Sequence, residues 1–453
     1  MHLKTFQALN KKLHTAAKDA VNRNLQEVRV KVKDLYDSET FMQDTANDDA
    51  KNQNKFKTPL KPGDIGVMYD GTWQKRGKGL SHNGICNTME VNTGYLLDYE
   101  VLSNFCQGCL QAPDEDSPSF EAWVEAHAPK CQKNTDSSAH NMETVGAEAI
   151  WGRSEQHDVP LRYRSFLSDG DSAAFLTVSK MKPYGEDDII KEDCANHVAK
   201  RLGTALRKVK GLPRGHSLKE HTIKKLTLYY RIAVSKNKGD VKKMHQAIWA
   251  SYLHSASTDE AHNHKLCPPG EDSWCQFNQA IAKDEEPPPH KPRLSKPQAE
   301  AITDIYKRLS EQSLLSRCRQ GKTQNPCESL NGRIWLLCPK TRYASLRSVQ
   351  TAAAIAILWY NKGYTGFSDV LNELKIDIPK SLKKETVRAD TKRIEAMQKK
   401  GTGEQRYKRD KRALTLALET DKRKKREGIT YHSGGLDLGM FDHVCDSDSA
   451  QDE

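Results

Sequence analysis

The stretch YRSFLSDGDS, residues 163–172, constrains the fold more than any other part of the chain. Its apolar residues predict the end of a short strand, and Asp169 and Asp171 follow directly on a glycine turn. A strand fixes a carboxylate while the turn leaves it accessible, which favours a divalent metal site. The alternative is an ordinary solvated acidic loop. Two further acidic positions bear on this choice.

The first of these positions is Asp70. The segment DIGVMYDGTW, residues 64–73, predicts a short apolar strand that ends on Asp70. The segments GICNTMEV and YLLDYEVLS, joined by the turn NTG, predict a hairpin by alternation and turn chemistry. Asp70 therefore belongs to the first strand of a predicted three-stranded antiparallel meander, with its carboxylate in the middle of a sheet.

The second position is Glu328, in the segment TQNPCESLNGRIWLLCPKT. Pro326 suits the first turn of a helix, and Glu328 lies in that turn with Leu330, Ile334 and Leu337 predicted to face the core. The alternative is that the acid only complements the helix dipole.

Three carboxylates on separate elements suggest a two-metal site. Two close carboxylates can hold two Mg²⁺ ions, and a third from a helix completes the site. Two such ions activate the attacking oxygen and steady the leaving oxygen in phosphodiester displacement. No Walker loop, nucleophile elbow or dinucleotide fingerprint in the sequence competes with this interpretation.

Eleven cysteines, an odd number, predict thiols and metal ligands rather than disulfides. The opening MHLKTFQALNKK lacks the apolar core of a signal peptide, and the longest apolar run is too short for a membrane span, so an intracellular chain is expected. The pattern C-x2-C-x17-H-x3-C has the paired spacing of a structural zinc site, with free buried cysteines as the alternative. Its residues are Cys106, Cys109, His127 and Cys131.

A second metal site is possible further along the chain. Cys194 and His197 could share a metal with Cys267 and either His264 or Cys275. The alternative is that these residues stabilise the region by ordinary packing and hydrogen bonds.

Periodicity and composition divide the chain into five regions. Hydrophobic residues make up 36% of the chain and the mean hydropathy is −0.78, so polar tails or linkers are expected. The predicted regions are an N-terminal helical segment (1–58), a first part of the α/β core with the zinc-like insert (59–197), a helical insertion (198–315), a second part of the core (316–375) and a tail (376–453).

The positive charge of the chain is concentrated in this tail. Residues 380–426 contain 18 Lys and Arg and 7 Asp and Glu, a difference of +11 that equals the net charge of the whole chain. Such a segment suits a polyanion, most simply nucleic acid, although a solvated basic helix has the same composition. The run KRKKR at 422–426 is consistent with a nuclear address, and the acidic end of the chain predicts disorder.

Seven segments in order resemble the Mutator-like transposase domain, found in cut-and-paste DNA transposons of the Mutator and Kolobok kind. The resemblance covers roughly residues 64–363. The segments are DGTWQKRG…HNG, LDYEVLSNFCQGC, the pair ME with the pair GA (residues 142–147), SDGDS, CANHVAKRLGTALR, HKLCPPGEDSWC and TQNPCESLNGRIW…CPK.

The resemblance implies an α/β fold with an RNase H-like mixed-sheet core, interrupted by a large helical insertion. It also implies a catalytic triad of Asp70, Asp169 and Glu328 that binds Mg²⁺ or Mn²⁺, with Asp171 as the alternative second acid. Cys194 and His197 match the C-x2-H motif that follows the second acid in such transposases. The implied activity is cleavage and joining of double-stranded DNA at transposon ends and target, by a nuclear protein acting as a homo-oligomer.

Two departures from the family pattern keep other functions open. Relatives usually carry Asn-x-Asn-Glu before the third acid, whereas residues 325–328 are NPCE, which puts the start of that helix in question. No separate zinc-finger module precedes residue 64. The alternatives are therefore an inactive or domesticated copy that only binds DNA or chromatin, and a metal-dependent nuclease without strand transfer.

Overall fold

The computed structural model describes residues 3–38, 58, 60–74, 81–170 and 173–401, and it divides the chain into two compact units. The first unit comprises residues 1–194 and 322–390, and the second comprises 195–321 and 391–453. The divisions after residues 194 and 321 lie close to the limits predicted for the helical insertion, 198 and 315. The second unit is therefore inserted into the first in the sequence, and the first unit is formed by two parts of the chain that are far apart in the sequence.

The first unit is built on one five-stranded mixed sheet, in the order β3-β2-β1-β4-β5. Strands β1, β2 and β3 form an antiparallel meander, and β4 and β5 continue the sheet parallel to β1. The α/β class and the predicted meander are therefore confirmed. The strands are β1 (Asp64–Trp73), β2 (Asn83–Glu90), β3 (Leu96–Ser103), β4 (Arg162–Ser168) and β5 (Ile190–Asp193).

Two features of the sheet differ from the sequence prediction. Strand β1 continues three residues beyond Asp70, because Thr72 and Trp73 still pair with β2. Strand β5 was not predicted, since its four residues, IKED, show no apolar alternation. It joins the sheet through backbone pairing with β4.

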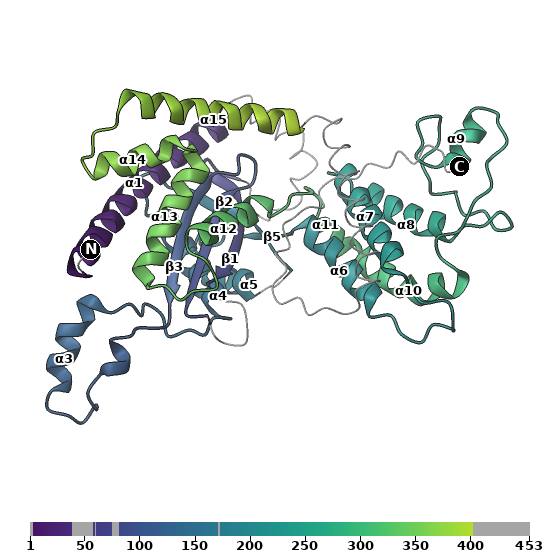
Figure 1. The fold of residues 1–453 in the computed structure, drawn as a ribbon. Coiled ribbons are helices and arrows are strands. Elements are labelled where there is room, and N and C mark those ends of the chain that lie inside the picture. The colour runs from purple at the N-terminus through teal and green to yellow at the C-terminus, as the bar shows by residue number, and fades with distance from the viewer. Residues whose placement is uncertain (1–2, 39–57, 59, 75–80, 171–172, 402–453) are drawn as a thin grey trace, which may run out of the picture. The chain divides into compact units, whose positions relative to one another are not determined.

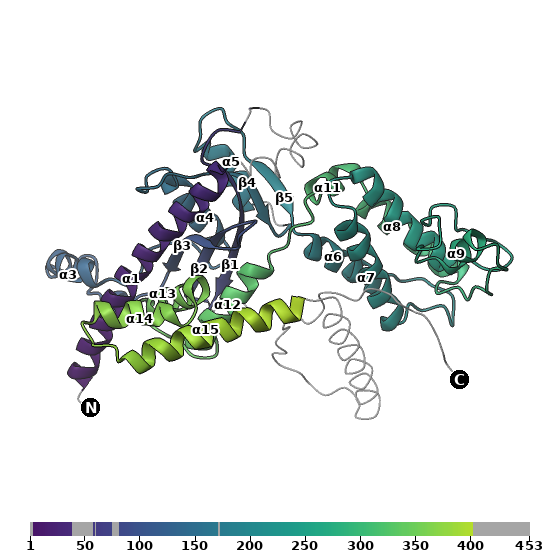
Figure 2. The ribbon, with the colours of Figure 1, turned by 90° about the horizontal axis from the view of Figure 1, so that it is seen from above.

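Helices cover both faces of this sheet (Figure 1), and Figure 2 shows the strands between α4 and α5 on one side and α12 and α13 on the other. Alternation along β1 decides which side chain meets which layer. Val67 and Tyr69 pack with residues of α4 and α5, whereas Met68 packs with α12 and α13. The helices are α4 (Met142–Arg153), α5 (Ala173–Met181), α12 (Asn325–Leu337), α13 (Leu346–Lys362) and α14 (Thr365–Glu373).

The predicted N-terminal helical segment is one long helix, α1 (Leu3–Asp37), that belongs to the first unit. Its alanine-rich middle packs in the same hydrophobic cluster as α13, and Val28 and Val32 pack in the cluster on the other face of the sheet. The buried Arg29 donates two hydrogen bonds to the carbonyl oxygen of Leu97 in β3. Helix α1 therefore contributes to the core rather than preceding it.

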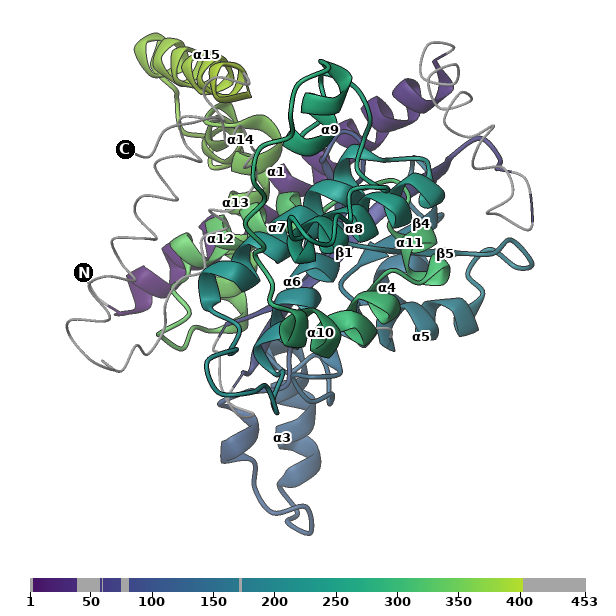
Figure 3. The ribbon, with the colours of Figure 1, turned by 90° about the vertical axis from the view of Figure 1, so that its right-hand side faces the viewer.

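Between β3 and α4 the chain makes an excursion that stands away from the sheet, as Figure 3 shows for α3. It contains α3 (Phe120–His127) and two short 3₁₀ helices, Cys109–Gln111 and Ala128–Lys130. None of these three elements has a buried residue. Hydrophobic packing therefore does not explain its structure.

Within residues 195–321, which the structure describes completely, the second unit is helical and contains no strand. Its hydrophobic cluster is formed by side chains from the helices on either side of a long segment, residues 257–293. The helices are α6 (Ala195–Arg207), α7 (Glu220–Lys236), α8 (Val241–Ala256), α9 (Gln276–Ala282), α10 (Lys296–Leu309) and α11 (Gln312–Arg317).

The basic tail begins as helix α15 (Lys380–Gly401). The rest of it, including KRKKR and the acidic end, lies outside the described residues. Helix α12 starts at Asn325 with Pro326 in its first turn, so the NPCE sequence still forms a helix start. Leu330 and Ile334 are buried as predicted, but Leu337 is exposed because it lies at the last residue of the helix.

Candidate functional site

Asp70 lies in β1, the central strand of the sheet, opposite Asn87 of β2. Because side chains alternate along a strand, Asp70 shares its face with Met68 and not with Tyr69. Met68 packs in the hydrophobic cluster that contains residues of α12 and α13. The carboxylate of Asp70 therefore lies on the side of the sheet that α12 covers.

Asp169 follows the last residue of β4, which runs parallel to β1. Met68 pairs with Leu167, so Asp70 and Asp169 each lie two residues beyond a matched pair. Neighbouring strands are about 4.8 Å apart, so continuing this register brings the two acids side by side. Asp169 is exposed and accepts a hydrogen bond from the backbone N–H of Gly170, whereas Asp171 lies outside the described residues.

Glu328 lies in the first turn of α12, and Gln324 fixes where that turn begins. The side-chain amide of Gln324 donates to the carbonyl oxygen of Tyr69 at 2.7 Å, next to Asp70 in β1. Its backbone N–H donates to the Sγ of Cys194 at 3.4 Å. The start of α12, and Glu328 with it, is therefore attached directly to the central strand.

The pKa of the buried Cys327 thiol depends on acidic groups from both elements. Burial, followed by the negative charges of Asp70, Cys194 and Glu328, raises the pKa of Cys327 well above its usual value. Acids from β1 and from α12 thus act on one buried side chain.

Asn331 connects the helix to the first acid, and sequence reasoning missed it. Its side-chain N–H donates to Oδ2 of Asp70 at 2.7 Å, and its side-chain oxygen accepts from Asn87 at 3.0 Å. Asn331 is three residues after Glu328, so both lie on the same side of α12. That spacing is the signal in the sequence that could have identified it.

Lys340 lies close to Thr72, the residue of β1 that is two positions beyond Asp70 and on the same face. The hydroxyl of Thr72 accepts a hydrogen bond from the indole N–H of Trp335 at 2.9 Å and one from Nζ of Lys340 at 3.3 Å. The Lys340 cation also lies over the Trp335 ring, 5.1 Å from its centre. A positive charge is therefore present close to the acidic positions.

Asp70 lies in β1, Asp169 follows β4 and Glu328 lies in the first turn of α12, and the oxygens of these acids are not tightly clustered. Within the described part of the chain, groups of three or more potential ligand atoms lying within 4.8 Å of one another are two cysteine–histidine sets, and the acids form none. An all-oxygen donor set suits Mg²⁺ or Mn²⁺. Since two ions in such sites lie about 3.5–4 Å apart, their ligands need not all converge on one point.

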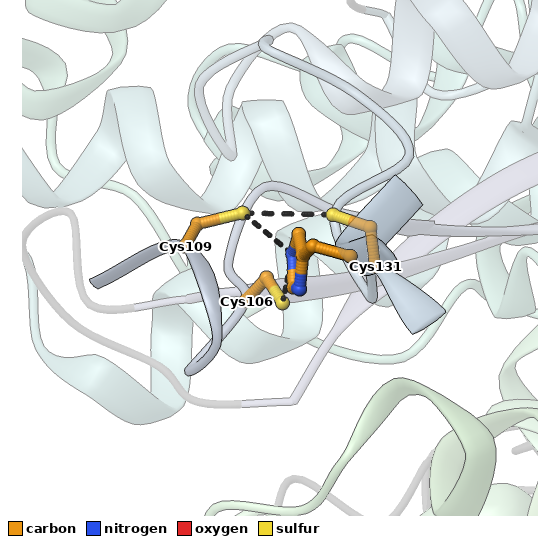
Figure 4. Close-up of side chains that lie close together, drawn as sticks. Cys106, Cys109 and Cys131 are labelled. Carbon is orange, nitrogen blue, oxygen red and sulfur yellow. Dashed lines mark hydrogen bonds between the residues drawn. The ribbon is translucent and has the colours of Figure 1, made fainter. Parts of the chain in front are cut away.

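The first cysteine–histidine set is the one predicted from the sequence spacing, and its three thiols lie together in Figure 4. The Nε2 atom of His127 lies 3.6 Å from the Sγ of Cys106 and 3.3 Å from that of Cys109, and the Sγ atoms of Cys109 and Cys131 are 3.6 Å apart. Ligand atoms around a tetrahedral Zn²⁺ are roughly 3.3–3.8 Å apart. The four side chains therefore have the spacing of a tetrahedral metal site.

Two local features support this first set as ligands. Burial would raise the pKa of Cys106, but backbone N–H groups of Gln132, Cys109 and Gly108 outweigh it and lower this pKa to about 6. Burial and the neighbouring thiols raise the pKa of Cys109 to about 11, so the pair readily gives up one proton to form a thiolate. Gly108 is also required, because a Cβ there would lie 2.4 Å from Cε1 of His127.

The second set contains three predicted residues and one that was missed. His264, Cys267 and Cys275 come together with His254, near the end of α8. Cys194 and His197 belong to neither set in the described part of the chain. Cys194 instead lies in the first unit, where it accepts a hydrogen bond from Gln324, and His197 lies in α6. Helix α8 has the pattern of an ordinary amphipathic helix, which concealed His254.

A family model described as Mutator-like transposase matches residues 1–275. No curated protein matches the chain. The matched region includes Asp70, Asp169 and both cysteine–histidine sets, but it ends before Glu328, whose assignment therefore depends on the geometry of α12. No described helix has both the length and the apolar character needed to cross a membrane.

Proposed function

The chain belongs to the Mutator-like transposase family, and from this premise we propose that it is a cut-and-paste DNA transposase. Asp70, Asp169 and Glu328 would form its catalytic centre and bind Mg²⁺ or Mn²⁺. The observation that carries the proposal is that α12, the helix with Glu328 in its first turn, is held to Asp70 by the hydrogen bond from Asn331, while Asp169 follows β4, the strand paired in parallel with β1.

The fold supports this proposal. The mixed five-stranded sheet with helices on both faces is compatible with the RNase H-like core that the family resemblance implies. The helical second unit enters the chain between β5 and α12, that is, between the second and third acids. This is the position that the resemblance implies for the insertion.

The reaction proposed is cleavage of a phosphodiester followed by transfer of the freed strand. Water attacks phosphorus, the P–O3′ bond breaks, and the leaving oxygen takes a proton as the 3′ hydroxyl. The oxygen of that hydroxyl then attacks a phosphodiester of the target DNA and forms a new P–O bond, and the 3′ oxygen of the target strand leaves and takes a proton. Divalent ions, when bound, lower the pKa of the attacking water and neutralise charge on the phosphate.

The residues of the chain have separate roles in this proposal. The carboxylates provide the oxygen ligands, and Asn331 fixes the orientation of Asp70 through the hydrogen bond to Oδ2. Lys340, on the same face as Asp70, would contact a phosphate oxygen of the bound strand. Residues of the basic tail would add phosphate contacts that carry no sequence information.

The first cysteine–histidine set is proposed to be a structural zinc site. The donor set of three thiols and one imidazole suits Zn²⁺. The helices of the surrounding excursion, residues 106–131, have no buried residue, so hydrophobic packing of these helices contributes little to its stability. The ion would be bound by Cys106, Cys109, His127 and Cys131, and it would join the two ends of the excursion. A nuclear location and assembly as a homo-oligomer complete the proposal, since two transposon ends must be joined.

The test is nicking of supercoiled plasmid in Mn²⁺ by the purified chain. Asp70→Asn, Asp169→Asn and Glu328→Gln should each lose nicking by at least about 100-fold while DNA binding changes little. Asp304→Asn, an exposed acid of α10, is the matched control and should nick at the wild-type rate. Asp171→Asn is included because it decides between the two candidates for the second acid.

Two results would redirect the proposal. Full nicking by both Asp70→Asn and Glu328→Gln would remove these acids from the catalytic centre. Salt-sensitive DNA binding without nicking by the wild type would favour a domesticated DNA-binding protein instead. If the chain nicks DNA but does not join a pre-cut 3′ end to target DNA, it is a nuclease without strand-transfer activity.

A further inference from the structure

The segment 257–293 of the second unit is attached to the helices around it without contributing to their core. The hydrophobic cluster of this unit uses side chains up to Tyr252 and resumes at Leu294. Between them the segment has one short helix, α9. A stretch of this length needs some other source of order, because fixing its backbone costs about 1–2 kcal/mol per residue.

Four side chains that can bind a metal lie close together at the end of α8, where the segment begins. His254 lies in the last turn of α8, His264 and Cys267 lie in the segment, and Cys275 is the N-cap residue of α9. Their ligand atoms all lie within 4.8 Å of one another. His264, Cys267 and Cys275 are buried, with 3%, 4% and 0% of their surfaces exposed.

The separations among these atoms match a tetrahedral ion. The Nδ1 atoms of His254 and His264 are 3.2 Å apart. Nδ1 of His264 lies 3.5 Å from Sγ of Cys275, and Nδ1 of His254 lies 3.7 Å from Sγ of Cys267. Around Zn²⁺, two imidazole nitrogens are about 3.3 Å apart, and a nitrogen and a sulfur are about 3.5 Å apart.

The outer contact of His264 fits the same arrangement. Nε2 of His264 lies 3.0 Å from the hydroxyl of Ser257, which itself accepts from the backbone N–H of Asn263. The His264 tautomer that carries its proton on Nε2 would donate to Ser257 and present an unprotonated Nδ1 to the other ligands. A ligand histidine in a metal site commonly has its second nitrogen hydrogen-bonded in this way.

We propose that His254, His264, Cys267 and Cys275 form a zinc site of the second unit, in which the ion attaches residues 257–293 to the end of α8. His254 is the fourth ligand, and the site is complete without Cys194 and His197. Because the segment adds no side chain to the hydrophobic cluster, metal binding supplies the free energy that orders it. The helices α6, α7, α8 and α10 keep their own core when the ion leaves. This inference does not depend on the proposed transposase activity.

The test measures zinc bound to the purified full-length chain by mass spectrometry of the metal. His254→Gln and Cys275→Ser should each bind one zinc fewer than wild type. His245→Gln is the matched control, because His245 is exposed on the same helix, and it should bind as much zinc as wild type. Cys194→Ser should also bind the wild-type amount.

Two outcomes of this measurement would overturn the proposal. An unchanged zinc content in His254→Gln would remove that residue from the site. Loss of one zinc in Cys194→Ser would instead return Cys194 to the ligand set.

A second measurement covers the case in which these variants do not purify. In the chain carrying Cys106→Ser and Cys109→Ser, Co²⁺ should still produce the absorption of a tetrahedral cobalt site with two thiolates. Chelation of zinc from the wild type should accelerate amide hydrogen exchange in residues 257–293 by at least about 10-fold, with α7 unchanged. Absence of the cobalt bands, or equal exchange in both states, would contradict the proposal.

Discussion

At the scale of single residues, Asn331 is the contact that joins the third-acid helix to the first acid. Asn331→Ala removes the hydrogen bond to Oδ2 of Asp70 and leaves the Asn87 amide without its acceptor. We expect the nicking rate to fall about 10- to 100-fold and the Mn²⁺ concentration for half-maximal rate to rise, because residues that orient metal ligands have effects of this size.

The matched control for this prediction is Ser329→Ala, an exposed position in the same helix. The measurement is the dependence of the initial nicking rate on Mn²⁺ concentration, with thermal unfolding of each variant beside it. An unchanged metal dependence in Asn331→Ala would mean that Asp70 does not need this contact.

Lys340 is the second residue whose effect can be predicted. Its Nζ lies by Thr72, on the face of β1 that carries Asp70, so it is placed to contact a phosphate near the cleavage site. Lys340→Ala should weaken DNA binding and lower the slope of log affinity against log salt by about one. Fluorescence anisotropy at several salt concentrations measures this, with Lys243→Ala, an exposed lysine of α8, as the control. Equal slopes for Lys340→Ala and wild type would exclude the phosphate contact.

At the scale of elements, a buried ion-pair network connects α1, β3 and α4. Asp98 of β3 lies 3.5 Å from the guanidinium of Arg29, 2.9 Å from that of Arg153 and 3.3 Å from His157. Asp98→Asn leaves the buried Arg29 without its carboxylate, which should lower the free energy of unfolding by about 3–5 kcal/mol. Glu100→Gln, a more exposed partner of Arg153, should cost less than about 1 kcal/mol. Urea unfolding of both variants is the measurement, and equal losses would contradict the role of the network.

The same network predicts a pH dependence. Burial would raise the pKa of Asp98, but hydrogen bonds from His157 and Arg153 and the charge of Arg29 lower it below its usual value. A carboxylate with a lowered pKa stabilises the folded state above its unfolded pKa of about 4, and this contribution is lost as the pH falls through the folded pKa. The difference in stability between wild type and Asp98→Asn should therefore shrink below about pH 4.

Elements could be predicted from the sequence where the order of apolar and polar side chains, or the spacing of ligand residues, is distinctive. The meander around Asp70 consists of short apolar segments joined by the turn NTG, and the first cysteine–histidine spacing predicted all four residues of its set. Strand β5 was missed because its charged residues, IKED, are in the sheet only through backbone pairing. Asn331 and His254 were missed for a different reason. Asn331 contacts Asp70, which is distant in the sequence, and His254 lies beside ligand residues of the segment that follows α8.

At the scale of the whole molecule, the inserted unit begins and ends at nearly the same place. Sγ of Cys194 accepts a hydrogen bond from the backbone of Gln324 at 3.4 Å, although 130 positions separate them. Residues 195–321 should therefore be replaceable by a Gly/Ser linker of about four to six residues without preventing the first unit from folding.

The shortened chain should unfold cooperatively, bind one zinc through Cys106, Cys109, His127 and Cys131, and bind DNA more weakly. Circular dichroism during thermal unfolding and metal analysis measure the first two properties. A chain that remains unfolded would show that the first unit needs the insertion for its own stability.

The interrupted first unit also determines when, during protein synthesis, the proposed catalytic centre can exist. Asp70 and Glu328 are separated by 258 positions, which a ribosome adding about 5–20 residues per second covers in roughly 13–50 s. During that interval the meander lacks α12 and α13, and the inserted helices emerge complete before the unit that surrounds them. A nascent chain would therefore carry its first two acids without the third. Any truncated product that ends inside the insertion would be unable to cut DNA.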